Sequence, residues 1–466
     1  MIKKEHLALY LATVVPLVAA VIVALFAGRS LQPPDAVAAT VTAPPESHFA
    51  ANATAPFALL LLQMVVVIAV ARAVGALFSK IGQLAVIGEI AAGVLLGPSL
   101  FGALAPAGFA GLFPAASMGN LQLLSQLGLL LFMFVVGMEL DLGLMRSRAA
   151  EALVISHASI FFPFALGVAL AYALYTSFAP SHVTFVPFAL FMGIAMSITA
   201  FPVLARILKE RHMTKTAEGN MAIVCAAIGD VTAWCILPFV IAISRAGDLV
   251  NAWFTIVLTA IYVAVMFFVV SPALKTLRRR MSTPEAAGPA FIAVAFLTLL
   301  TSAYVAEIIG IHALFGAFVA GAAMPSKVSL RTLLTERVEA VGTYLLMPLF
   351  FAYSGLRTQI GLLDDVRLWT IFGLIVVTAV AGKVLGTACA ARLVGQSWHD
   401  SLTLGALMNT RGLMELIVLN IGYDLGILSP AMFTMLMLMA LLTTCMTAPA
   451  LNLLERLALR AAVTAP

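Results

Sequence analysis

The chain contains 466 residues, of which 62% are hydrophobic and only 10% are charged, and its mean hydropathy is +1.08. So few polar side chains cannot coat a water-soluble protein of this length, and the composition therefore indicates an integral membrane protein. The net charge is +5, but the basic residues are dispersed in short loops between apolar stretches; membrane topology accounts for them, and nucleic-acid binding is not expected. The cysteines all lie inside apolar stretches and give no redox or metal signal: Cys225, Cys235, Cys389 and Cys445.

Apolar stretches follow one another almost from end to end of the chain. A membrane core of about 30 Å takes about 20 apolar residues per helix, and unpaired backbone groups exclude open sheets in lipid, so each stretch predicts a helix. We expect one N-terminal span near 7–27, followed by a core of further spans. The expected core spans are 56–78, 82–97, 120–138, 150–177, 184–208, 216–244, 249–270, 287–308, 310–325, 341–356, 367–393, 401–422 and 430–455.

The two ends of the chain predict additional segments. Basic residues precede the first apolar run, so residues 1–28 are either a membrane anchor, which the length of the run favours, or a cleaved signal peptide. The Pro/Ala-rich residues 29–55 then form a periplasmic linker, residues 56–456 form the transmembrane domain, and residues 457–466 form a short cytoplasmic tail.

The distribution of basic residues sets the orientation. With the N-terminus in the cytoplasm, most lysines and arginines outside the spans fall on the cytoplasmic side. The basic residues that fall outside are Arg29, Arg245, Arg357 and Arg367. This positive-inside bias supports a multi-pass protein of a bacterial inner membrane.

A weak internal repeat relates the two halves of the core. The third core span contains LFMFVVGMEL at 131–140, which resembles MPLFFAYSGL at 347–356 in the tenth, and the second and ninth spans are both Gly/Ala-rich and end in Pro-Ser. Because this offset is an odd number of spans, the two copies cross the membrane in opposite directions, as in the inverted repeats of secondary transporters. Chance similarity of Gly/Phe-rich membrane helices is the alternative.

Asp230 lies near the middle of the span 216–244. A carboxylate at that depth is destabilising unless it is protonated, paired or facing water, which makes it a functional candidate. A buried carboxyl that titrates near the working pH can exchange a proton for a cation. The structural alternative is a neutral Asp bonded to neighbouring backbone.

Two spans contain sequences that break a helix. Ser197 and Thr199 lie beside Pro202 in the fifth core span, and proline frees backbone carbonyls that could coordinate a cation. A plain proline kink is the alternative. The matching segment of the second half is Met408-Asn409-Thr410-Arg411-Gly412, whose polar residues indicate unwound backbone lining a cavity.

Several further charges lie within spans. Lys383 is too deep to reach either surface and needs an acidic partner, a carbonyl-lined pocket or neutralisation. Arg411 and Glu415 are spaced i,i+4 and can pair on one helix face. Glu89 and Glu139 lie nearer to helix ends, where structural ion pairing is the favoured interpretation.

Four motifs carry a resemblance to a known family. They are GEI to GPS at 88–99, VGMELD at 136–141, SITAFPVLAR at 197–206 and MNTRGLMEL at 408–416. In these motifs the chain resembles the monovalent cation:proton antiporter-2 family, most of all its plant and fungal cation/proton exchanger branch and that branch's bacterial relatives. The likeness covers roughly residues 56–456, in the same order.

The resemblance implies a fold and a mechanism. The implied fold is an all-α polytopic membrane protein with a sodium/proton antiporter-like core of thirteen helices, built from two inverted repeats with crossed broken helices, plus one extra N-terminal helix. It implies a homodimer with dimerisation and core subdomains, in which the core carries the ion by an elevator-type movement. Asp230 is then the transport carboxylate, Thr199 and Asn409 lie at the helix crossing, and Lys383 is the membrane-embedded lysine of the second half.

Two features depart from the family pattern. Relatives usually have Asp, Asn or Gln immediately before the transport aspartate, whereas this chain has Gly229. We therefore expect Lys383 to pair with Asp230 itself when no cation is bound; the alternative is a neutral lysine that serves as packing. The sequence ends at Pro466, so we expect no cytosolic regulatory domain of the kind found in many relatives.

The residues together predict a transporter. We expect a secondary active exchanger of a monovalent cation, K⁺ or Na⁺, for protons, surrounded by membrane lipid and requiring no cofactor. The histidines show no ligand spacing and no nucleophile–base pair appears, so an enzyme is not expected. The expected ion- and proton-binding residues are Asp230, Thr199, Ser197, Asn409 and Thr410. A cation channel and a non-transporting membrane sensor or subunit are the alternatives.

Overall fold

The computed structural model describes residues 55–139, 149–214, 216–246, 249–280, 284–325 and 341–464, with isolated positions outside these ranges. The expected anchor or signal peptide (1–28) and almost all of the expected linker (29–55) lie outside the described residues. Every regular element within the described ranges is a helix. The last helix continues through Thr464, so the residues expected to form a tail extend it instead.

The helices pack into two bundles. Contacts within the first, the scaffold bundle, join α3 to α4, α14 to α15, and α17 to both α4 and α7. Its members are α3 (Pro56–Lys80), α4 (Ala85–Leu96), α7 (Ala115–Glu139), α14 (Pro284–Ile309), α15 (Ala313–Ala323) and α17 (Met347–Leu356).

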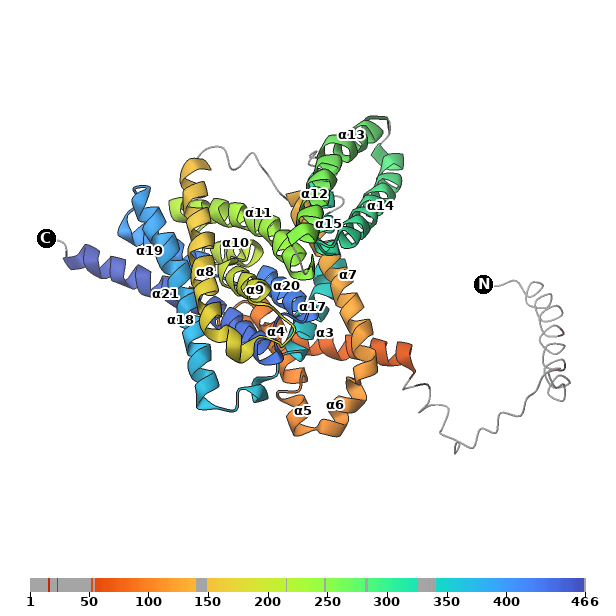
Figure 1. Cartoon of the computed structure of the whole chain (residues 1–466), viewed down its shortest axis with the longest axis horizontal. Coiled ribbons are helices and arrows are strands. Elements are labelled where there is room, and N and C mark those ends of the chain that lie inside the picture. Colours follow the sequence, from red (N-terminus) through yellow and green to blue (C-terminus); the bar gives the residue numbers. More distant parts are fainter. Residues whose placement is uncertain are drawn as a thin grey trace, which may run out of the picture. The chain divides into compact units, whose positions relative to one another are not determined.

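The second, the crossing bundle, is built around α8 and α18, which pack on each other and on α9 and α19 (Figure 1). Its members are α8 (Ala149–Phe178), α9 (Phe185–Ser197), α10 (Phe201–Glu210), α11 (Ala217–Ala246), α18 (Val366–Leu393), α19 (Trp398–Met408), α20 (Leu413–Asp424) and α21 (Pro430–Thr464). The remaining elements are α5 (Phe101–Leu104), α6 (Pro106–Leu112), α12 (Leu249–Val265), η2 (Met266–Val270), α13 (Ser271–Arg280), η3 (Gly342–Leu346) and η4 (Ile360–Leu362).

Each expected core span corresponds to a helix or a broken helix pair among the described residues. Ten helices are long and apolar enough to cross a membrane, and α19 with α20 forms one further span bent by 44°. The remaining two spans are α15 and the joined η3 and α17. The expected span 310–325 is shorter than predicted, because α15 begins only after His312, which has a φ of 78°.

The two halves of the core make matching contacts. In the first half α4 packs on α3 and α9 on α8, and in the second half α15 packs on α14 and α19 on α18. Across the halves, α4 contacts α17 just as α15 contacts α7. This exchange of partners is the arrangement expected of two inverted repeats.

Glycines allow the scaffold helices to approach closely. A Cβ on Gly93 of α4 would collide with the backbone carbonyl of Ala352 on α17, and a Cβ on Gly321 of α15 would collide with that of Phe134 on α7. Small residues let helix backbones pack together where lipid supplies no hydrophobic driving force between helices. The two contacts are related by the repeat, so the same device holds both halves of the scaffold bundle.

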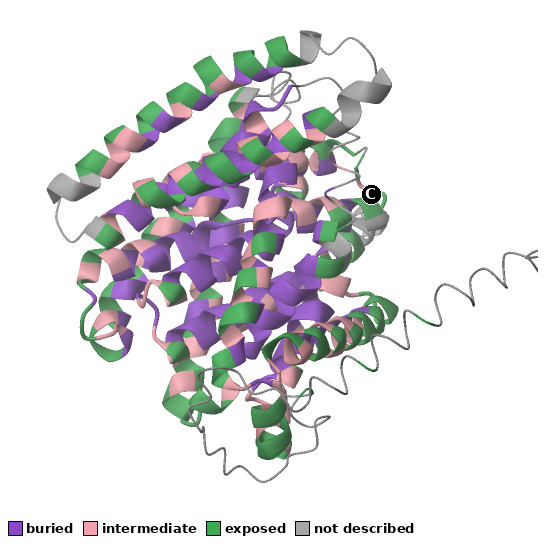
Figure 2. Ribbon diagram, turned by 90° about the vertical axis from the view of Figure 1, so that its right-hand side faces the viewer, coloured by how far each residue is buried: buried purple, intermediate pink, exposed green. Residues whose placement is uncertain are grey.

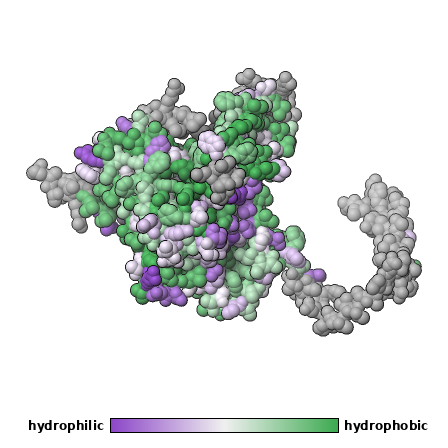
Figure 3. Space-filling view, in the orientation of Figure 1, coloured by the Kyte–Doolittle hydropathy of each residue, from purple (hydrophilic) through white to green (hydrophobic). Residues whose placement is uncertain are grey.

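The outer surface is suited to lipid. Buried residues gather in the interior, whereas exposed residues follow the outward faces of the helices (Figure 2). The surface over α12 and α14 is mainly hydrophobic (Figure 3). Phe254 of α12, Phe268 of η2 and Leu297 of α14 are among the exposed large hydrophobic residues. Large exposed apolar surfaces of this kind mark contact with a membrane or with another protein.

The glycine contacts lead to a stability prediction. Gly93→Ala and Gly321→Ala should each lower the unfolding free energy by about 1–3 kcal/mol, because backbone atoms would have to move to admit the methyl group. Gly373→Ala on α18 is the matched control, since a Cβ there meets nothing within 4 Å. Thermal unfolding in detergent, followed by size-exclusion chromatography, measures the difference. Equal melting temperatures for all three variants would contradict the close-packing argument.

Candidate ion-binding site

Two broken helices cross inside the crossing bundle. Helix α9 ends at Ser197 and α10 begins at Phe201, while α19 ends at Met408 and α20 begins at Leu413. Pro202, the second residue of α10, has no backbone N–H to continue a helix. Gly412 has a φ of 158°, and a Cβ there would lie 2.8 Å from Val203. Local sequence therefore breaks both spans at the same depth.

The two breaks are bonded directly to each other. The Thr199 hydroxyl donates to the Met408 carbonyl at 2.8 Å, and the Ala200 N–H donates to the Thr410 carbonyl at 3.1 Å. Thr199 therefore lies at the crossing, as expected. Ser197, in contrast, donates to the Gly193 carbonyl of its own helix at 2.6 Å, so its hydroxyl hydrogen is used one turn back.

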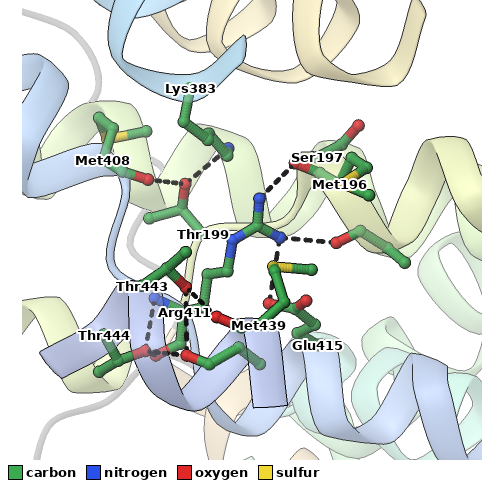
Figure 4. A network of polar contacts seen from close by, with 12 residues as sticks. Met196, Ser197, Thr199, Lys383, Met408, Arg411, Glu415, Met439, Thr443 and Thr444 are labelled. Carbon is green, nitrogen blue, oxygen red and sulfur yellow. Dashed lines mark hydrogen bonds and ion pairs between the residues drawn. The ribbon is translucent and has the colours of Figure 1, made fainter. Parts of the chain in front are cut away.

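Arg411 neutralises the carboxyl end of α9. Its Nη1 donates to the Ala195 carbonyl at 2.6 Å and its Nη2 to the Met196 carbonyl at 2.8 Å (Figure 4). The expected pair with Glu415 is present, with 3.1 Å between Nη1 and Oε2, and both side chains are fully buried. A cation at a helix C-terminus and an anion in the first turn of a helix each stabilise the helix by interacting favourably with its dipole. Arg411 and Glu415 satisfy these two conditions for α9 and α20.

Lys383 reaches the crossing from α18 but does not pair with Asp230. Its Nζ donates to the Thr199 hydroxyl at 2.8 Å, to the Ser159 carbonyl at 2.9 Å and to the Ser159 hydroxyl at 3.3 Å. These three oxygens match the three hydrogens of an ammonium group. No ion pair with Asp230 is formed in the described part of the chain, so the expected pairing is wrong for this conformation. Neutral oxygens brought together by α8 and the α9–α10 break replace the carboxylate.

Asp230 has neither carboxyl oxygen in a hydrogen bond with any described residue. The residue lies on α11 and is only 5% exposed. The backbone N–H of Phe201 and the Lys383 ammonium are its electrostatic neighbours. Buried polar groups are almost always satisfied, so two free carboxyl oxygens indicate a site made for a proton or a cation. The Asn409 Oδ1 is likewise without a partner among the described residues, at the end of α19, on which α11 packs.

The other expected site residues lie around this centre or apart from it. The Thr410 hydroxyl contacts that of Thr447 at 3.2 Å. Glu89 pairs with Arg72 at 3.3 Å in the scaffold bundle, which agrees with the structural interpretation. Glu139 ends α7, and its side chain lies outside the described residues.

Two site residues were not predicted from the sequence, namely Ser159 and Thr444. The Thr444 hydroxyl of α21 accepts the Arg411 N–H at 3.2 Å and lies 2.9 Å from the Arg411 carbonyl, so it holds the second break from below (Figure 4). Thr443, Thr444 and Thr447 lie close together in the sequence of the last span. This group of hydroxyl residues is the one sequence feature that could have indicated Thr444. Ser159 gave no such signal.

Comparisons with known proteins place the chain in a family. A family model described as the transmembrane region of sodium/hydrogen exchangers matches residues 64–453. The chain belongs to this family. It is 42% identical over 392 residues to the Na⁺/H⁺ antiporter NhaS4 of Synechocystis sp., covering 84% of this chain and 96% of that protein. The resemblance to cation/proton antiporters is thereby confirmed.

Eukaryotic relatives are longer. Cation/H⁺ antiporter 19 of Arabidopsis thaliana is 39% identical over 400 residues, covering 85% of this chain and 50% of that protein. K⁺/H⁺ antiporter 1 of Saccharomyces cerevisiae is 33% identical, covering 85% and 46%. The chain thus spans about half the length of these two relatives.

A solved structure supports the fold. The sodium proton antiporter MjNhaP1 from Methanocaldococcus jannaschii aligns with a TM-score of 0.56, covering 85% of this chain and 97% of that one, at 12% sequence identity. At this identity the likeness shows a shared fold only.

The bonds of Thr199 lead to a prediction. Thr199→Val keeps the side-chain volume but removes both the donor to Met408 and an acceptor of Lys383. We expect it to weaken the apparent cation affinity more than the maximal rate, whereas Thr199→Ser should behave nearly as wild type. Exchange rates against cation concentration measure both quantities. Thr298→Val is the control, since that hydroxyl bonds only its own helix at Val294. Unchanged affinity in normally expressed Thr199→Val would reduce Thr199 to part of the helix break.

Proposed function

We propose that the protein is a secondary active antiporter that exchanges a monovalent cation, K⁺ or Na⁺, for a proton across the inner membrane, with Asp230 as the shared binding group. The observation that carries the proposal is the buried Asp230 carboxyl, which has no hydrogen-bond partner among the described residues and lies beside two crossed broken helices. The relatives named as Na⁺/H⁺ and K⁺/H⁺ antiporters support both candidate cations.

The exchange follows from competition for one carboxylate. A cation binds ionised Asp230 with neutral oxygens completing its coordination, and Asn409 and Thr199 are the proposed donors. A proton binds the same carboxyl and excludes the cation. The carboxylate together with either one bound cation or one bound proton has no net charge. One cation therefore exchanges for one proton, and the net reaction is electroneutral.

The charge balance at the crossing supports this stoichiometry. The buried positive residues there are Lys383 and Arg411, and the buried acidic residues are Asp230 and Glu415. Glu415 is paired with Arg411, and Lys383 is bonded to neutral oxygens. Asp230 is therefore the acid that remains available for cargo.

Alternating access is proposed to use the two bundles. The crossing bundle carries the site, and it meets the scaffold bundle along α20 with α17 and along α21 with α4. A movement of one bundle against the other, of the elevator type, would expose Asp230 to each side in turn. A homodimer joined through the scaffold side is part of the same proposal. A channel is less well supported, because Thr199, Asp230 and Asn409 are all buried.

The primary test replaces the cargo-binding group. Asp230→Asn should abolish exchange while the protein still inserts and folds, because the change removes a titrating charge at nearly constant volume. Cation-driven pH change in everted vesicles, followed with a pH-sensitive dye, gives the readout. Asp364→Asn is the matched control, since that carboxyl is exposed. Exchange at the wild-type rate in correctly folded Asp230→Asn would remove the assignment.

A second test concerns the charge next to Asp230. Lys383→Gln should shift the pH profile of exchange, because Asp230 loses a positively charged neighbour. Gly229→Asp should also shift the profile. A Cβ at Gly229 lies 3.5 Å from Ser156 Oγ, one turn from Ser159, so an added carboxylate lies near the group that holds Lys383. Identical profiles for wild type and both variants in proteoliposomes would show that Lys383 takes no part in the proton chemistry.

A further inference from the structure

We propose that Arg357 is a positioning residue that fixes the outer end of α20 to the scaffold bundle and closes the outer route to Asp230 in this conformation. The inference rests on the proposed function and on the topology that places Arg357 outside. It concerns a residue of the loop after α17, remote in sequence from the motifs that carry the family resemblance.

The guanidinium group of Arg357 has two polar partners and lies near two aromatic rings. Its Nη1 donates to Asn420 Oδ1 at 3.0 Å, and its Nη2 is ion-paired with Asp424. The guanidinium carbon lies 4.7 Å from the centre of the Tyr353 ring and 4.9 Å from that of Tyr423. Charge-assisted bonds thus combine with cation–π contacts to two aromatic rings. Lysine could not reproduce this arrangement.

These contacts cross between the two bundles. Arg357 and Tyr353 belong to the end of α17, whereas Asn420, Tyr423 and Asp424 belong to the last turns of α20. The same helix end is held by further bonds, from Gln122 Nε2 on α7 to Asp424 Oδ2 at 3.2 Å and from Asn420 Nδ2 to Ser354 Oγ at 2.8 Å. Since α20 is one half of a broken span, holding its outer end also holds the crossing.

The spaces at the two ends of the bundle interface differ in volume. Beside Arg357 the space lined by Gln122, Ser125 and Asp424 has a volume of about 20 Å³, enough for about one water molecule. On the side that the topology places in the cytoplasm, a cavity of about 310 Å³ is lined by Gln83, Arg211 and Thr444 among others. Thr444 also holds the Arg411 backbone, so this cavity reaches the helix break. On this proposal the conformation is open towards the cytoplasm, where the larger of the two spaces lies, and closed where Arg357 joins the bundles.

The population of the two conformations predicts opposite effects from the two sides. Apparent affinity falls with the fraction of protein in the binding-competent state. Arg357→Ala should therefore strengthen the apparent cation affinity measured from outside and weaken that measured from inside, so that the ratio of the two changes by about fivefold or more, the usual lower range of such couplings. Oriented proteoliposomes with the cation added to one side give both values. Arg367→Ala is the matched control, since Arg367 is exposed at the same end of the molecule and should change neither.

Chemical rescue separates positioning from general damage. Free guanidinium chloride should partly restore the wild-type ratio of the two affinities in Arg357→Ala, because the space between the tyrosine rings is then vacant. It should not restore the ratio in Arg357→Lys, where the lysine stem fills part of that space. A lack of any response in Arg357→Ala, with both affinities equal to those of Arg367→Ala, would overturn the proposal.

A labelling measurement does not depend on transport. Ser125 is buried and lines the small space beside Arg357. In a variant whose native cysteines are replaced by alanine, Ser125→Cys should therefore react slowly with a membrane-impermeant thiol reagent added outside. Adding Arg357→Ala should raise that rate several-fold, and Arg357→Lys should give a smaller increase. Equal labelling rates with Arg357, Arg357→Ala and Arg357→Lys would refute the role of Arg357 in closing the outer route, even if the protein exchanges ions. Conversely, if the wild-type protein shows no exchange but the labelling rates change as expected, only the proposed function is refuted.

Discussion

The structure depends on satisfying four helix ends in the middle of a membrane. Breaking two spans exposes the carbonyls that end α9 and α19 and the N–H groups that begin α10 and α20, and each unsatisfied group in lipid costs several kcal/mol. The crossing resolves this because each break supplies what the other lacks. Thr199 binds the end of α19, Arg411 binds the end of α9, and the Ala200 N–H binds the Thr410 carbonyl. The flanking helices add Lys383 from α18 and Thr444 from α21.

This arrangement divides the buried charges into two kinds. Arg411 and Lys383 are held by several oxygens, and Glu415 is held by Arg411, so these three charges stabilise the crossing. Asp230 has no hydrogen bond to a described residue and is the charge left for a cargo ion or proton. A buried charge is stable only when it is paired or solvated, so an unpaired carboxylate strongly favours binding something positive. Different residues of the crossing therefore stabilise the broken helices and remain available for the cargo.

The two bundles hold together in different ways. Scaffold helices meet backbone to backbone at Gly93 and Gly321, which leaves little room for rearrangement. Between the bundles, polar contacts around Arg357 lie beside an apolar cluster to which both bundles contribute. Side-chain contacts at an interface can exchange partners when one body moves against another, whereas close-packed cores resist continuous deformation. The site therefore lies in the crossing bundle, which the contacts of Arg357 join to a closely packed scaffold.

The sequence alone determined the membrane-spanning architecture, both helix breaks and the buried aspartate. These features depend on local chemistry: the thickness of the bilayer sets the length of apolar runs, Pro202 and Gly412 interrupt helices wherever they occur, and an acid such as Asp230 within a span is conspicuous. The pairing of Arg411 with Glu415 was equally accessible, because it spans one helical turn.

Only the tertiary structure decided which groups meet across helices. Lys383 was expected to pair with Asp230, yet it binds Thr199 and Ser159, because its long side chain reaches oxygens that α8 and α9 bring together only after packing. Ser159 was not predicted because a hydroxyl in an apolar helix usually bonds its own backbone and leaves no sequence pattern. The polar partners of Arg357, Asn420 and Asp424, lie more than sixty residues away on another helix. Contacts of this kind depend on how whole helices are placed, and no local pattern in the sequence encodes that placement.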